Sequence, residues 1–174
     1  MRSAALAFAF MAAALATAAP EARAGCFNDC FGSKMQGDTD DIAAKDFARE
    51  CRATCDAQSA DRMASAGVDP ARLQTCKAER LSLEQFRDVR AASPSYRVQS
   101  NIFLWDVVNP YPDKALTRIE VSTQTLELQE LTLTGTGLAP PSSTATFVIP
   151  EFYEGYPAVR FTAKIRAIWA CEVK

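Results

Sequence analysis

The sequence contains no histidine. Histidine is the usual base of Ser-His and Cys-His nucleophiles and the commonest protein ligand of zinc and copper. Its absence disfavours the usual hydrolytic and metal chemistry, and we expect a non-enzymatic protein with no catalytic residues, no bound metal and no cofactor. Neighbouring carboxylates, such as Glu127 with Glu130 and Glu151 with Glu154, could act as acid and base, but we interpret them as solvated charge.

The sequence also lacks a basic stripe or tail, and its formal net charge is −2. Nucleic acid and anionic membrane surfaces are therefore poor candidate partners. After residue 24 no stretch approaches the roughly 20 apolar residues of a membrane span, so we expect no integral membrane segment in the mature chain.

The first 24 residues have the pattern of a signal peptide. Arg2 is followed by an apolar run from Ala4 to Ala19 and by the small-x-small site Ala22-Arg23-Ala24. Loss of Arg2, Arg23 and Glu21 changes the net charge from −2 to −3. The pattern predicts a periplasmic protein that begins at Gly25. In the alternative interpretation Gly25-Cys26 ends a lipobox and Cys26 is lipidated, although Arg23 stands where an aliphatic residue is required.

Four of the six cysteines form two Cys-x-x-x-Cys pairs, Cys26 with Cys30 and Cys51 with Cys55. Residues four apart lie on the same face of a helix. Two antiparallel helices would join them by two parallel bridges, Cys26–Cys55 and Cys30–Cys51. The crossed pairing, Cys26–Cys51 with Cys30–Cys55, requires parallel helices, for which the connection from Phe31 to Glu50 is short.

This pattern resembles the twin Cys-x-x-x-Cys helical hairpins of the small mitochondrial intermembrane-space chaperones and the plant α-hairpinins. The resemblance covers Cys26 to Cys55 and supports the same pairing. Those families include chaperones, protease inhibitors and antimicrobial peptides, so the resemblance implies a scaffold rather than one function.

Residues 25–92 have the composition of helices. Gln36 to Thr39 predicts the hairpin turn, with Asp38 or Thr39 as the cap of the second helix. Gly67 is expected to end that helix, and Asp69-Pro70 to begin another. Ser82 and Gln85 have the spacing of a capping box for a last helix.

Residues 93–174 are rich in β-branched and aromatic residues that alternate, which predicts an antiparallel, sandwich-like β domain and makes the chain α+β. Asn101 to Val108 is expected to be covered on both faces. Further strands are expected at Ile119 and Val121, at Leu126 and Leu128, at Leu131 and Leu133 after a bulge or corner at Gln129-Glu130, and at Thr144 to Ile149. The last strand is expected at Val159 to Val173, with Trp169 and Cys171 on its core face, and loops are expected at Asn109 to Asp113 and Gly135 to Pro141. The two remaining cysteines, Cys76 and Cys171, are predicted to bond to each other.

The best candidate for partner binding is the segment Pro150 to Pro157, which carries Phe152, Tyr153 and Tyr156, with Tyr111 in a loop of the same kind. Alternatively, these aromatic side chains fold back over the core. We therefore expect an exported accessory or assembly subunit that binds another protein in an envelope complex. The alternative function is a thiol-redox or Cu(I)-handling factor that uses the cysteine pairs, with Met35 and Met63 as additional ligands.

Overall fold

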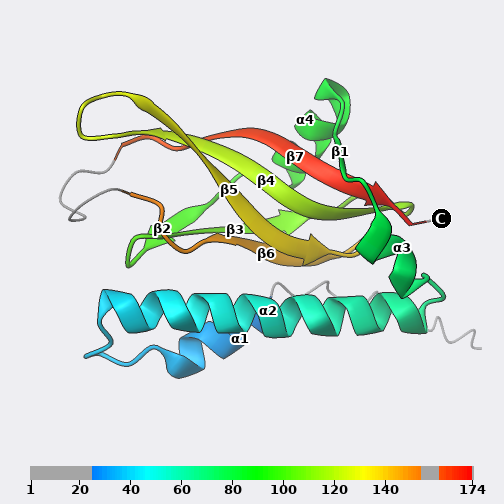
Figure 1. Cartoon of the computed structure of the whole chain (residues 1–174), viewed down its shortest axis with the longest axis horizontal. Helices are drawn as coiled ribbons and strands as arrows, with labels where there is room; N and C mark the ends of the chain where they lie inside the picture. Colours follow the sequence, from blue (N-terminus) through cyan, green and yellow to red (C-terminus); the bar gives the residue numbers. More distant parts are fainter. Residues whose placement is uncertain (1–24, 154–160, 174) are drawn as a thin grey trace, which may run out of the picture.

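The structure, a computed structural model, describes residues 25–153 and 161–173. The predicted leader, residues 1–24, lies outside the described residues. The elements confirm the α+β class, because helices linked by disulfides are combined with an antiparallel sheet (Figure 1). In chain order they are α1 (Gly25–Lys34), α2 (Asp41–Ser65), α3 (Pro70–Thr75), β1 (Glu79–Arg80), α4 (Leu83–Ala92), β2 (Arg97–Gln99), β3 (Ile102–Val108), β4 (Lys114–Gln124), β5 (Glu130–Ala139), β6 (Thr144–Ile149) and β7 (Lys164–Glu172).

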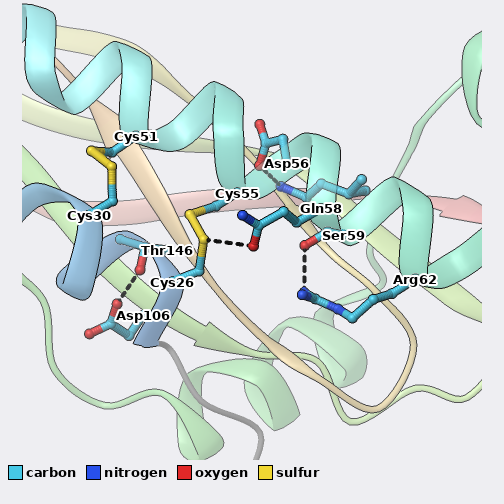
Figure 2. The surroundings of a disulfide bond; sticks show 11 residues. Cys26, Cys30, Cys51, Cys55, Asp56, Gln58, Ser59, Arg62, Asp106 and Thr146 are labelled. Carbon is cyan, nitrogen blue, oxygen red and sulfur yellow. Dashed lines mark hydrogen bonds between the residues drawn. A yellow bond between two sulfur atoms is a disulfide. The ribbon is translucent and has the colours of Figure 1, made fainter.

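Helices α1 and α2 form the predicted disulfide-linked hairpin. Disulfides join Cys26 to Cys55 and Cys30 to Cys51, which confirms the parallel pairing and not the crossed one (Figure 2). The turn lies at 37–38 as expected. The cap of α2 is one or two residues later than predicted, because the carboxylate of Asp40 accepts the backbone N–H of Ala43 at 2.7 Å.

The other predicted helix boundaries in this region are correct. Asp69 caps α3 with Pro70 in its first turn, and Ser82 and Gln85 form a complete capping box at the start of α4. The predicted disulfide Cys76–Cys171 connects the end of α3 to β7. Three disulfides fit a protein that folds in an oxidising compartment.

All seven strands belong to one continuous antiparallel sheet with the order β1-β7-β4-β5-β6-β3-β2. The predicted antiparallel, sandwich-like domain is therefore built from one sheet, whereas an immunoglobulin-type sandwich has two separate sheets. The sheet bends along β5, so that β4 and β7 face β3 and β6 across a shared core (Figure 1). Ile168 of β7 and Phe103 of β3 belong to the same cluster of buried side chains.

Two glycines inside β5 allow this bend, although the sequence predicted a loop from Gly135 onward. A Cβ atom at Gly135 would lie 2.7 Å from Cγ1 of Ile119 and 3.0 Å from Cγ1 of Ile149. A Cβ atom at Gly137 would lie 3.0 Å from the carbonyl oxygen of Thr146. Glycine is therefore needed where β5 lies close to neighbours on both sides, and it does not end the strand.

Strand β3 is covered on both faces, as predicted. Phe103 and Trp105 point into the core between the halves of the sheet. Ile102 and Leu104 point to the opposite face, where they pack with Phe27 and other side chains of the helical hairpin. The hairpin thus lies on the outer face of β3 and β6, below the sheet in Figure 1.

Two sequence-based strand assignments are wrong in their side-chain direction or extent. The register of β7 against β4 shifts between Ile165 and Ala167, which moves Ile168 into the core and turns Trp169 and Cys171 to the outer face. Leu126 and Leu128 lie in the turn between β4 and β5, where 59% and 65% of their surfaces are exposed, and they are not part of a strand.

Candidate interaction surface

Among the described residues, the predicted aromatic anchors do not form an exposed patch. Phe152 is fully buried, and its ring lies 5.0 Å from that of Phe103 and 4.7 Å from that of Tyr153. The assignment of Phe152 to a partner interface is therefore corrected: it is a core residue, as in the alternative interpretation.

Tyr153 is partly buried and held by its own chain. Its backbone N–H donates to Oδ1 of Asn101 at 2.6 Å, and Nδ2 of Asn101 donates to its carbonyl oxygen at 2.8 Å. Its hydroxyl donates to the carbonyl oxygen of Phe161 at 2.9 Å. Tyr156, the third aromatic residue of the prediction, lies outside the described residues.

Tyr111 connects its loop to α4. Its hydroxyl lies 3.0 Å from Oδ2 of Asp88 and 3.2 Å from the carbonyl oxygen of Gln85. Burial, together with the hydrogen bond to the Asp88 carboxylate, raises the pKa of Tyr111 to about 12. The polar end of this side chain is thus used inside the protein, as the end of Tyr153 is.

All six cysteines are bonded in pairs, so no thiolate is present for redox exchange or for Cu(I) in this state. The two methionines considered as additional ligands lie in different clusters, Met35 with the hairpin and Met63 with Ala115 and Val173. Within residues 25–153 and 161–173, no three Cys, Asp or Glu side chains gather to hold a metal ion. No described helix combines the length and apolar character needed to cross a membrane.

The helices leave one outer face of the sheet uncovered. Among the described residues they pack mainly on β3, β5 and β6, while the end of α2 and Leu73 of α3 share a cluster with Ala115 and Val173, and the end of α3 is bonded to Cys171 of β7. Beyond these contacts the strands β5, β4 and β7 carry a set of outward side chains that we call the bare face. Cross-strand pairing places on it Thr132, Thr134 and Thr136 of β5, Arg118, Glu120 and Ser122 of β4, and Ala167 and Trp169 of β7.

A stacked arginine and tryptophan lie at the centre of one row of the bare face. Arg118 pairs in register with Trp169, and its guanidinium carbon lies 4.2 Å from the centre of the indole ring. Both side chains are half-buried. Nε of Arg118 is buried and has no hydrogen-bond partner within the described parts of the chain. Tryptophan and arginine are the residues most enriched at the energetic centres of protein interfaces.

The next arginine on this side is satisfied internally, which distinguishes it from Arg118. Nε of Arg166 donates to Oγ of Ser122 at 2.7 Å, and its guanidinium also pairs with the carboxylate of Glu130. The hydrogen bond from Arg166 lowers the pKa of Glu130. Arg166 is therefore paired within the sheet, whereas Arg118 is stacked on Trp169 and its Nε has no hydrogen-bond partner among the described residues.

Sequence reasoning placed Trp169 in the core and did not single out Arg118. The shift in β7 register reverses the direction of Trp169, and the alternation of side chains does not reveal it. No protein-family model, curated protein or solved structure matches this chain. The resemblance to twin Cys-x-x-x-Cys hairpins is thus limited to the helix pair and its two disulfides, Cys26–Cys55 and Cys30–Cys51.

Proposed function

We propose that this protein is an exported, non-enzymatic accessory or assembly subunit that binds another protein through the bare face. The observation that carries the proposal is the stacked pair of Arg118 and Trp169 on a part of the sheet that no described helix covers. The compartment proposed is the periplasm, from the leader pattern and the three disulfides.

The bare face has the chemical composition of an interface centre with a polar rim. Trp169 offers a large flat apolar surface, and Arg118 is held against it, so little side-chain freedom remains to be lost on binding. Exposed threonines of β5 lie on one side of the pair, with Thr136 in register with Arg118, and can exchange hydrogen bonds with water for hydrogen bonds with a partner. A carboxylate or carbonyl group of the partner is the natural acceptor for Arg118.

Site-specific photo-cross-linking in cells tests the proposal. A cross-linking residue at Thr134, in the exposed part of the bare face, should capture one protein in stoichiometric yield. The matched control is the exposed Ala57 on α2, which should capture no specific partner. Equal capture from both positions, or capture from neither, contradicts the proposal.

A pair of arginine variants tests the anchor itself. Arg118→Ala should weaken binding of the captured partner by about 2 kcal/mol or more, roughly thirtyfold. Arg118→Lys keeps the charge but not the planar stacking, so we expect it to recover only part of the affinity. Full binding by Arg118→Ala, with an unchanged melting temperature, would place the interface elsewhere.

A further inference from the structure

We propose that a hollow between α3, β1, α4 and β7 binds a small organic dianion, such as a phosphomonoester or a dicarboxylate. This site borders the contact between Arg118 and Trp169, because its lining residue Arg80 pairs in register with Trp169, but neither Arg118 nor Trp169 lines it and it does not depend on the proposed function. The cavity measures about 400 Å³. This volume lies in the lower part of the range of small-molecule sites, which is about 300–1,000 Å³.

The charge of the lining differs from that of the whole chain. Arg72, Lys77, Arg80 and Lys114 line the hollow together with two carboxylates, Glu79 and Glu172, so its formal charge is +2. The whole chain carries a net charge of −2. A cavity with this excess of positive charge attracts small anions to itself in preference to the rest of the surface.

Two of the four cations pair with other groups, and two have no partner among residues 25–153 and 161–173. Nζ of Lys114 is paired with Glu172 at 2.9 Å, and Arg80 donates to the carbonyl oxygen of Arg166 at 3.0 Å. The side chains of Arg72 and Lys77, by contrast, have no hydrogen bond or ion pair within the described residues. A guanidinium fork and an ammonium group on one wall suit the oxygens of a phosphate or of two carboxylates.

The walls of the hollow are fixed before any ligand binds. The disulfide Cys76–Cys171 holds the end of α3 against β7, and the backbone N–H of Leu81 donates to the carbonyl oxygen of Ile168 at 2.9 Å. The capping box at Ser82 fixes the start of α4. Binding therefore orders few additional groups, which favours affinity. Leu81 and Ala170 provide a small apolar surface for the carbon part of a ligand.

Of the two lining carboxylates, Glu79 has no ion pair or hydrogen bond in the described part of the chain, and it opposes the binding of an anion. The proposal therefore predicts changes in both directions. Removing the charges of Arg72 and Lys77 should weaken binding, and removing the charge of Glu79 should strengthen it. A role of these residues in folding alone would not produce that pair of effects.

Isothermal titration calorimetry on the oxidised mature protein tests the site, with inorganic phosphate and succinate as separate probes and chloride at equal ionic strength as the blank. We expect saturable binding of at least one probe, and the stronger one identifies the ligand chemistry. Arg72→Ala with Lys77→Ala should weaken it by about tenfold or more, the equivalent of one charge-assisted hydrogen bond. Glu79→Gln should tighten it.

The matched control removes two positive charges elsewhere, by Lys45→Ala on α2 and Lys164→Ala at the start of β7. This control has the same net charge as the Arg72 and Lys77 double variant. Neither of its lysines lines the hollow, so it should bind the probe like the wild type. No saturable binding of either probe overturns the proposal. So does equal weakening in both double variants, which would indicate only a general charge effect. Since Glu79 is exposed, Glu79→Gln gives a decisive result even if the double variant is unstable.

Discussion

The carboxylate of Asp56 on α2 accepts a hydrogen bond from the backbone N–H of Leu138 on β5, across 2.8 Å. The same carboxylate pairs with Arg52 one turn earlier on the helix, at 2.7 Å. A side chain of α2 thus accepts the hydrogen bond of a backbone N–H near the end of β5. This contact links the disulfide-bonded hairpin to the bend of the sheet.

Replacing Asp56 by alanine should destabilise the protein by about 1–3 kcal/mol, because the N–H of Leu138 loses its acceptor in a partly buried place. Asp56→Asn keeps an oxygen acceptor and is the matched control. Urea unfolding measures both. An alanine variant as stable as the wild type would show that the hydrogen bond contributes nothing net.

The free energy of unfolding of Asp56→Asn should depend on pH differently from that of the wild type, and the pKa shift of Asp56 gives the direction of the difference. Desolvation raises the pKa of Asp56 above its ordinary value of 3.8 and outweighs the opposing effect of Arg52. The folded state therefore binds the proton more tightly than the unfolded state. The contribution of Asp56 to stability is fully present below pH 3.8 and is lost as the pH rises through the folded pKa.

Asp56→Asn has no such titration, so its stability relative to the wild type should increase as the pH rises from below 3.8 through the folded pKa of Asp56. Unfolding curves at several pH values give this difference directly. A constant difference would mean that Asp56 is better solvated than its position indicates.

Gly135→Ala should destabilise the fold by about 1–3 kcal/mol, the usual cost of overpacking a core. The new methyl group would meet Ile119 at 2.7 Å and Ile149 at 3.0 Å. Gly32→Ala, where an added Cβ meets nothing within 4 Å, is the control. Thermal unfolding distinguishes the two, and equal melting temperatures would contradict the role assigned to glycine in the bend.

Phe152→Ala should lower the free energy of unfolding by about 3–5 kcal/mol, because the side chain is fully buried among aromatic rings. Chemical denaturation measures the loss. Partner capture from Thr134 should persist at temperatures where the variant is folded. A stable variant that loses its partner would restore the original interface assignment of this residue.

Removing the disulfide between Cys76 and Cys171 by a double alanine variant should cost about 4–5 kcal/mol on the loop-closure model. The two cysteines are 95 residues apart in sequence, which makes this the longest of the three loops. Differential scanning calorimetry gives the comparison with the wild type. A loss in the free energy of unfolding below about 1 kcal/mol would mean that positions 76 and 171 stay close to each other in the unfolded chain without the bond.

Tyr111 should ionise about two pH units later than an ordinary tyrosine, since its pKa is raised from 10.0 to about 12. Asp88→Asn removes the carboxylate that contributes to this shift and should lower the pKa. Tyrosinate absorbance during an alkaline titration measures both proteins. Because the pKa of Tyr111 is raised in the folded state, its contribution to stability is present below pH 10 and is lost as the pH rises toward about 12. With a lower folded pKa, Asp88→Asn should lose this contribution over a smaller interval of pH.

The helical half was predictable because its signals are local. Ser82 with Gln85, Asp69 with Pro70 and the two cysteine pairs each specify a structure through residues a few positions apart. The bend at Gly135, the shift before Ala167 and the direction of Trp169 depend on neighbouring strands, which alternation along one strand does not encode. The candidate interface was missed for this reason, and of the aromatic residues chosen instead, Phe152, Tyr153 and Tyr111 pack in or against the core.

The outer face of β3 and β6 has a consequence for any attempt to divide the chain. Ile102, Leu104 and Val148 are buried there only because the hairpin of α1 and α2 lies on them. In a fragment that begins at residue 93, these three side chains would form a contiguous hydrophobic patch exposed to water. We expect such a fragment to self-associate through this patch. In the full chain, the hairpin of α1 and α2 covers the patch and prevents that association.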